Sequence, residues 1–89
     1  MRYSPADGVT AERSGERMVV LDAAGKELIT LSPVGALVWS QLPADFSAIL
    51  EELSEQFAEV AESTLTADLE AFLTELDEAG LVVATDAAR

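Results

Sequence analysis

The chain has no cysteine and no histidine. Without thiolates and imidazoles, it lacks the ligands of nearly every protein zinc site and the commonest general base at neutral pH. A Gly-rich phosphate loop, a calcium-loop spacing of carboxylates and a Gly-x-Ser-x-Gly nucleophile motif are missing as well. We therefore expect no catalytic residue, no metal and no cofactor, and we expect a binding domain and not an enzyme.

Basic residues are scarce and unevenly placed. The chain has 5 Lys and Arg against 17 Asp and Glu, a formal net charge of −12. Residues 1–39 hold four bases and five acids, whereas residues 40–89 hold one base and twelve acids. An acidic surface repels phosphate backbones and attracts cationic partners, so we expect no nucleic-acid partner. The alternative interpretation is that the acids only keep a small domain soluble.

Long apolar runs are missing too. Asp or Glu interrupts every helical apolar stretch, so no segment is predicted to cross a membrane. Residues 1–5 do not read as a signal peptide, and the absence of disulfides favours a reducing compartment, so we expect a cytoplasmic protein. With 89 residues, of which 49% are hydrophobic, the sequence predicts one domain over 1–89, with its core over about 9–83.

The first third of the chain has the pattern of β-strands. Alternating and β-branched residues predict strands at 9–13, 17–22 and 27–31. Gly15 and Gly25 fit the turns between them, because glycine readily adopts a positive φ. The simplest arrangement is a three-stranded antiparallel meander.

The rest of the chain has the signals of three helices. Ser32 and Pro33 predict the start of the first, as an N-cap followed by proline at the first helical position. Asp45 is the expected cap of the second, and Ser63 or Thr64 that of the third.

Apolar residues at helical spacing form one stripe on each of the two later helices. The stripes are Phe46, Ile49, Leu50, Leu53 and Phe57, then Leu65, Leu69, Phe72, Leu73 and Leu76. Gly80 ends the third helix, residues 81–83 are extended, and residues 84–89 are expected to fray. The order β-β-β-α-α-α predicts an α+β domain, a three-stranded antiparallel sheet followed by three helices.

The third strand is a candidate binding surface. An edge strand offers unpaired N–H and C=O groups to another chain, and residues 27–31 contain no proline that would block such pairing. We expect the backbone of this strand to pair with a peptide, and the third helix to form the opposite wall of a groove. Each apolar residue of that wall, taken singly, is also explained as core. The expected peptide-binding residues are Glu27, Leu28, Ile29, Thr30 and Leu31 on the strand, and Asp68, Leu69, Phe72, Glu75 and Leu76 on the helix.

Within this set the expected roles differ. The backbone groups of Leu28, Ile29 and Thr30 would pair with the peptide, and Asp68 and Glu75 would meet its basic residues at the rim. The residues expected to line an apolar pocket beneath the peptide are Leu31, Leu69, Phe72 and Leu76.

Two runs of residues resemble a known family. The first is Leu28-x-x-Leu31-Ser32-Pro33-x-Gly35-Ala36-Leu37-Val38-Trp39. It resembles the motif of the pyrroloquinoline quinone synthesis protein D family, in which Asn-Pro-x-Gly-Ala precedes an aliphatic residue and a Trp; Ser32 replaces the Asn. The second run, Ala71-Phe72-Leu73-x-Glu75-Leu76-x-x-Ala79-Gly80-Leu81-Val82, is similar to the closing helix and Gly-Leu-Val segment of that family.

The resemblance implies a winged helix-turn-helix domain that recognises precursor peptides. In the family, the leader of a ribosomally made peptide adds antiparallel to the third strand, here 27–31, in the groove beside the third helix, here 65–79. The implied partners are that leader peptide and a leader peptidase or another maturation enzyme. A stand-alone chain of this size is similar to the recognition subunit of lasso-peptide pathways.

Two other classes of protein share some of these features. A winged-helix transcription regulator would need a basic recognition helix, yet the charged residues of the second and third predicted helices are all Asp or Glu. An acidic carrier protein would need an attachment serine that opens a helix. The run Ser63-Thr64-Leu65 imitates that site poorly, and three leading strands do not fit a carrier.

Overall fold

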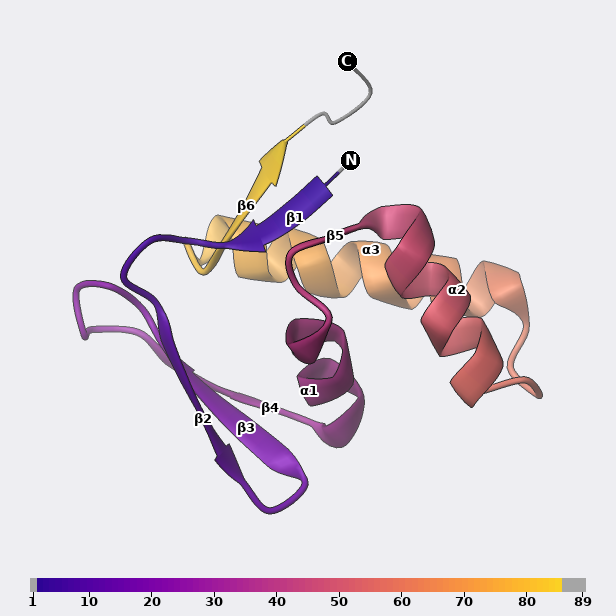
Figure 1. The fold of residues 1–89 in the computed structure, drawn as a ribbon, viewed down its shortest axis with the longest axis horizontal. Coiled ribbons are helices and arrows are strands. Elements are labelled where there is room, and N and C mark those ends of the chain that lie inside the picture. The colour runs from indigo at the N-terminus through magenta and orange to yellow at the C-terminus, as the bar shows by residue number, and fades with distance from the viewer. Residues whose placement is uncertain (1, 86–89) are drawn as a thin grey trace.

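The computed structural model describes residues 2–85 and consists of two small sheets joined by three helices (Figure 1). It is flat, with extents of 37 × 37 × 17 Å. The elements are β1 (Arg2–Pro5), β2 (Thr10–Ser14), β3 (Arg17–Leu21), β4 (Leu28–Leu31), α1 (Pro33–Ser40), β5 (Ala44–Asp45), α2 (Phe46–Gln56), α3 (Glu62–Glu78) and β6 (Val82–Thr85).

The predicted three-stranded meander is confirmed. The strands β2, β3 and β4 form an antiparallel sheet in that order, with Val20 opposite Ile29 and Met18 opposite Leu31. The third strand begins at Leu28, one residue later than predicted, because Glu27 belongs to the preceding loop. With the three helices, this sheet confirms the predicted α+β fold, a three-stranded antiparallel sheet followed by three helices.

The second sheet was not predicted from the sequence. The strand β1 pairs antiparallel with β6 on one side and with the two-residue β5 on the other, which brings the two ends of the described chain together (Figure 1). The expectation that residues 84 and 85 fray is therefore wrong, because they pair with β1. The remainder of the expected tail, residues 86–89, lies outside the described part of the chain.

Of the predicted helix N-caps, the one of α1 is confirmed and the one of α3 is not. The Ser32 hydroxyl accepts a hydrogen bond from the Gly35 N–H at 3.2 Å, as an N-cap should. The prediction that Ser63 or Thr64 caps α3 is wrong. The N-cap is Ala61, two or three residues earlier, and its carbonyl accepts a hydrogen bond from the Thr64 N–H at 3.0 Å.

The end of α3 agrees with the sequence. Gly80 has a φ of +77°, the Gly80 N–H donates to the Asp77 carbonyl, and the Leu81 N–H donates to the Leu76 carbonyl at 2.9 Å. This pair of bonds is a Schellman motif, which satisfies the last carbonyls of the helix and turns the chain sharply into β6.

The core has two parts, and α1 and α3 contribute to both. One part contains Ala36 and Trp39 of α1 with Leu76 of α3, packed against the buried face of β3 and β4. The other contains Val38 of α1, which packs with α2 and α3. Helix α1 therefore ties the β2–β3–β4 sheet to the helical pair. Within residues 2–85, none of the helices combines the length and hydropathy that a bilayer crossing requires.

A side chain in the β3–β4 loop holds the start of β4. The Asp22 Oδ1 atom accepts hydrogen bonds from the Lys26 N–H at 2.8 Å and from the Glu27 N–H at 3.2 Å. The Asp22 N–H in turn donates to the Glu27 carbonyl at 3.1 Å. The backbone hydrogen bond from Glu27 is the main cause that lowers the pKa of Asp22 below its ordinary value of 3.8.

We predict that Asp22→Ala loosens this loop. The amides of Lys26 and Glu27 should exchange hydrogen faster, because they lose their acceptor, and Asp7→Ala should serve as an unaffected control. Since the pKa of Asp22 is lowered in the folded chain, its contribution is present above the ordinary pKa and is lost as the pH falls through the folded value. Unchanged exchange of both amides in Asp22→Ala would contradict this role.

Candidate functional site

The strand β4 lies at the edge of its sheet. It pairs with β3 on one side, and within the described residues no strand pairs with its other side. The central requirement of the sequence-based hypothesis, an edge with a free row of backbone groups, is therefore met by the structure.

The register decides which backbone groups of β4 are free. In an antiparallel ladder, residues alternate between bonding to the strand on one side and pointing their groups to the other side. The bond from the Asp22 N–H to the Glu27 carbonyl continues the β3–β4 register and marks that pair as a bonded one. Every second residue after Glu27 must also bond to β3, so Ile29 and Leu31 direct their N–H and C=O groups toward that strand.

The free groups therefore belong to Leu28 and Thr30, with one N–H and one C=O from each. This corrects the prediction in two places. The backbone of Ile29 already bonds to β3, and the N–H and C=O of Glu27 bond to Asp22. A chain that adds to this edge meets four backbone groups from two residues, and not a row from five.

The side chains of β4 alternate in the same way. Leu31 is buried and Ile29 half-buried on the face that α1 covers. Leu28 and Thr30 are exposed on the opposite face, and Leu28 is the most exposed large apolar residue described, at 62%.

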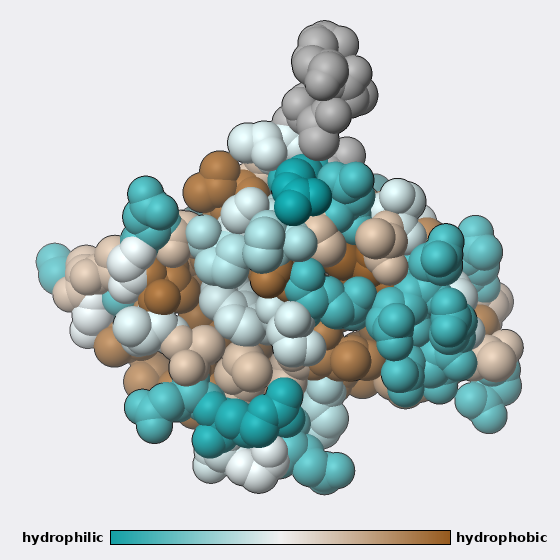
Figure 2. Space-filling model, in the orientation of Figure 1, coloured by the Kyte–Doolittle hydropathy of each residue, from teal (hydrophilic) through white to brown (hydrophobic). Residues whose placement is uncertain are grey.

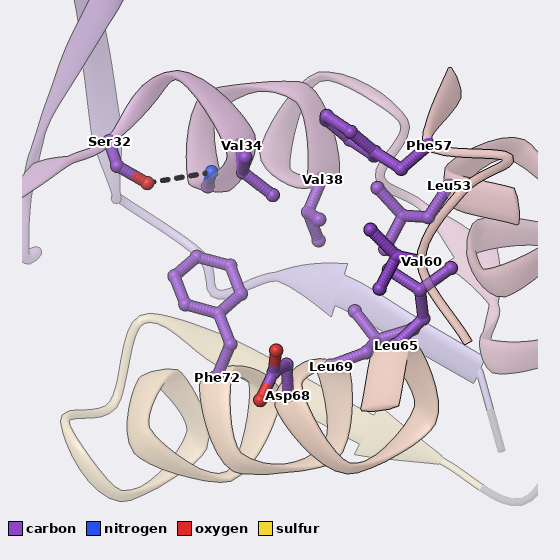
Figure 3. A pocket seen from close by; sticks show the side chains of 11 residues that line it. Ser32, Val34, Val38, Leu53, Phe57, Val60, Leu65, Asp68, Leu69 and Phe72 are labelled. Carbon is purple, nitrogen blue, oxygen red and sulfur yellow. Dashed lines mark hydrogen bonds between the residues drawn. The ribbon is translucent and has the colours of Figure 1, made fainter. Parts of the chain in front are cut away.

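Beyond the end of β4 lies an apolar pocket with a volume of about 320 Å³, between the start of α1, the end of α2 and the middle of α3 (Figure 3). We call it the α1–α3 pocket. Its lining residues are Ser32, Val34, Gly35, Val38, Leu53, Phe57, Val60, Leu65, Asp68, Leu69 and Phe72.

The predicted groove residues divide between this pocket and the core. Asp68, Leu69 and Phe72 line the pocket, with the Asp68 carboxylate at its side (Figure 3). Leu31 and Leu76 do not line it: they are 2% and 0% exposed and belong to the core. The prediction that they line this pocket is therefore not met, because Leu76 lies on the part of the helical stripe that supplies the core and Leu31 lies on the buried face of β4. Glu75 is exposed and does not line the pocket.

The sequence reasoning missed the contribution of α1 and α2 to the pocket. Val34 of α1, at 46% exposed, and Val60 after α2, at 38%, are large apolar residues left open to solvent. Phe57 was assigned to a buried stripe, yet it lies at the C-cap of α2 and is only half-buried. The position of Phe57, an apolar residue at the very end of its helical stripe, is the sequence signal that could have predicted that it lines a pocket.

Gly35 brings α3 against the start of α1. A β-carbon at Gly35 would lie 3.2 Å from the Phe72 ring and 3.3 Å from the Leu31 Cβ atom, both tighter than ordinary contact. Phe72 is thus packed directly over the glycine where β4 passes into α1, and its ring closes the pocket on that side (Figure 3).

The helices around the pocket are acidic. Neither α2 nor α3 contains a Lys or an Arg, and hydrophilic side chains gather over α2 (Figure 2). In the described part of the chain, the salt bridge present joins Arg2 to Asp45 at 3.7 Å, and both side chains are about half exposed, so it contributes little. The acids near the pocket are therefore not neutralised by ion pairs among the described residues.

Comparisons with known proteins point to one family. The sequence profile of coenzyme PQQ synthesis protein D (PqqD) matches residues 17–82. Among solved structures, the chain is similar to TbiB1 in complex with the TbiA(beta) leader peptide. The TM-score is 0.85 and the identity 22%, over 93% of this chain and 98% of that one. This likeness shows that the two chains share a fold. No curated protein sequence matches the chain.

We predict that Gly35→Ala lowers the free energy of unfolding by about 1 kcal/mol, because the added methyl group crowds the Phe72 ring and overpacking outweighs the gain in helix propensity. Chemical denaturation should show a smaller loss when the same substitution is made in a Phe72→Ala background. Equal losses in both backgrounds would mean that Phe72 does not press on this glycine.

Proposed function

The chain belongs to the coenzyme PQQ synthesis protein D (PqqD) family, and we propose that it binds the leader segment of a ribosomally synthesised precursor peptide. The leader adds as an antiparallel strand to the free edge of β4. The observation that carries this proposal is the position of the backbone N–H and C=O groups of Leu28 and Thr30, which point away from β3 at an edge that leads to an apolar pocket. The TbiB1 structure, which has the same fold and holds a leader peptide, supports a leader peptide as the ligand here.

The direction of the added strand follows from the pairing. An antiparallel peptide runs from the Leu31 end of β4 toward the Leu28 end, so the residues that precede its strand pass Ser32 and reach the α1–α3 pocket. We propose that a bulky apolar side chain of this preceding segment enters the pocket against Phe72 and Val34. Asp68, at the side of the pocket, would then meet a basic or hydroxyl group of the leader.

The energies assign different roles to the edge and the pocket. Four backbone hydrogen bonds, at about 0.5–1.5 kcal/mol net each, are offset in large part by the cost of ordering a flexible peptide. Burial of one large apolar side chain contributes about 1.5–3 kcal/mol more, and it depends on the side chain. The edge therefore orients any extended chain, and the pocket selects among sequences.

We propose that the chain is not itself an enzyme and that it presents the bound leader to a leader peptidase or another maturation enzyme. Among the pathways that use such a domain we propose lasso-peptide biosynthesis, on the resemblance of the sequence to the recognition subunit of those pathways. DNA binding is disfavoured, since helices α2 and α3 contain no base that could contact a phosphate.

We predict that Thr30→Pro weakens leader binding at least tenfold. Proline removes the outward N–H of Thr30 and its ring obstructs the incoming strand, while the ladder with β3 does not use that N–H. The measurement is fluorescence anisotropy of a labelled synthetic peptide that was selected on the native chain from a displayed library.

The matched control for that variant is Arg13→Pro on β2, the opposite edge of the same sheet. Arg13 also points its N–H outward, because the β2–β3 register bonds Ser14 and Glu12 to β3. This variant should bind the leader normally. If Arg13→Pro and Thr30→Pro weaken binding equally, or neither does, the leader does not add to β4.

We predict that salt slows association with a basic leader and leaves dissociation nearly unchanged. The acidic surface of α2 and α3 attracts cations over a Debye length of about 10 Å at 0.1 M salt, whereas the apolar anchor is insensitive to screening. Stopped-flow measurements from 0.05 to about 0.5 M NaCl check this. An association rate that does not change with salt would mean that the acids serve solubility alone.

A further inference from the structure

The face of the β2–β3–β4 sheet that points away from the helices carries a small apolar cluster. The register places one set of alternating side chains on this outer face. They are Thr10, Glu12 and Ser14 of β2, Arg17, Val19 and Leu21 of β3, and Leu28 and Thr30 of β4. The other set includes Met18 and Val20, which are 8% and 0% exposed and face α1. We call the first set the outer face.

Three apolar residues adjoin one another on the outer face. Leu21 lies directly opposite Leu28 in the register, and Val19 lies two residues along the same strand. They contribute to a shallow hollow of about 350 Å³ that is otherwise lined by polar residues of β2. Leu28, at 62% exposed, ends the cluster at the free edge of β4. The cluster is therefore continuous with the edge where the peptide is proposed to add.

A strand added to β4 must place alternate side chains on this face. In a bonded antiparallel pair, the two opposite residues direct their side chains to the same side of the sheet. The peptide residues opposite Thr30 and Leu28 thus point to the outer face, and those opposite Ile29 and Leu31 point toward the helices. Directly opposite side chains have Cβ atoms about 4.5–5.5 Å apart, close enough for contact.

We propose that the outer face is a second specificity subsite for the bound peptide, separate from the α1–α3 pocket. The peptide residue opposite Leu28 packs its side chain against Leu28 and extends the apolar cluster by one member. Because the cluster consists of aliphatic residues, the subsite takes a branched aliphatic or aromatic side chain. This inference rests on the proposed function, since it requires a strand on β4.

The proposal predicts to which face of the sheet each residue of the bound peptide points its side chain. Numbering the peptide from the residue opposite Leu31, the first and third residues point inward, the second lies beside Thr30 and the fourth lies beside Leu28. The fourth position should prefer Leu, Ile, Val, Phe or Tyr over Asp, Asn or Gly. A sequence selected only by the inward groove would show no such preference at an outward position.

The test is a double-mutant cycle between chain and peptide. The probe is a synthetic peptide selected on this chain from a displayed library of ten-residue sequences, with its register assigned from cross-strand NOEs to Leu28 and Thr30. Replacing an apolar fourth residue by Thr should raise Kd about threefold, within the range of cross-strand pairs, and less than about 1.5-fold when the chain carries Leu28→Thr. Val83→Thr, an exposed valine of the other sheet, is the control variant and should behave as the native chain.

The outcomes separate the inference from the proposed function. If NOEs place the peptide on β4 but the substitution has the same effect on Kd in the native and Leu28→Thr chains, the outer-face subsite is wrong and the binding mode stands. If the selected peptides give no NOEs to Leu28 or Thr30, both are wrong. The variant Leu28→Glu provides an independent test. Because it places a negative charge in the subsite, the preferred fourth residue of the peptide should change from aliphatic to Lys or Arg.

Discussion

Backbone N–H and C=O groups at the edge of a sheet bond either to water or to another chain, and β4 presents two of each at Leu28 and Thr30. The binding account depends on this constraint, since it sets the number of hydrogen bonds, the direction of the added strand and the side to which each of its side chains points. A different register of β4 by one residue would exchange the buried and exposed faces and would bring Leu28 and Thr30 into the ladder.

The structure holds this short strand in place from both ends. Asp22 fixes the chain at the start of β4 through two backbone amides, and Ser32 caps the helix that follows directly. Between these points, Leu31 is anchored in the core with Trp39 and Leu76. A four-residue edge strand can thus stay ordered without a second neighbour, which reduces the entropy that the chain itself would have to lose when a guest peptide binds.

Much of the fold was predictable because its signals are local. The hairpin turns, the Ser32 cap and the Gly80 stop each depend on a residue whose backbone preference is strong, and each is found where it was expected. The second sheet was not predictable in the same way, since β1 and β6 are far apart in sequence and short. The start of α3 was mispredicted because a cap contributes only about 1 kcal/mol, so the backbone hydrogen bonds that the Ala61 carbonyl accepts prevail over a cap at Ser63 or Thr64.

The candidate site was predicted at the level of elements and less well at the level of residues. An edge strand beside the third helix follows from the pattern, but the division of the apolar stripe between core and pocket does not. Leu76 and Phe72 lie four residues apart on one stripe, yet Leu76 is fully buried whereas Phe72 lines the pocket. What separates them is the packing of α1 against α3 at Gly35, a contact between segments that no local signal announces.

The most direct test of the account is amide hydrogen exchange on the chain with and without a saturating leader peptide. The outward N–H groups of Leu28 and Thr30 should become strongly protected in the complex, while those of Ala11 and Arg13, which point outward at the other edge of the sheet, should keep their rate. Protection confined to residues 68–72, with Leu28 and Thr30 exchanging as they do in the free chain, would contradict strand addition.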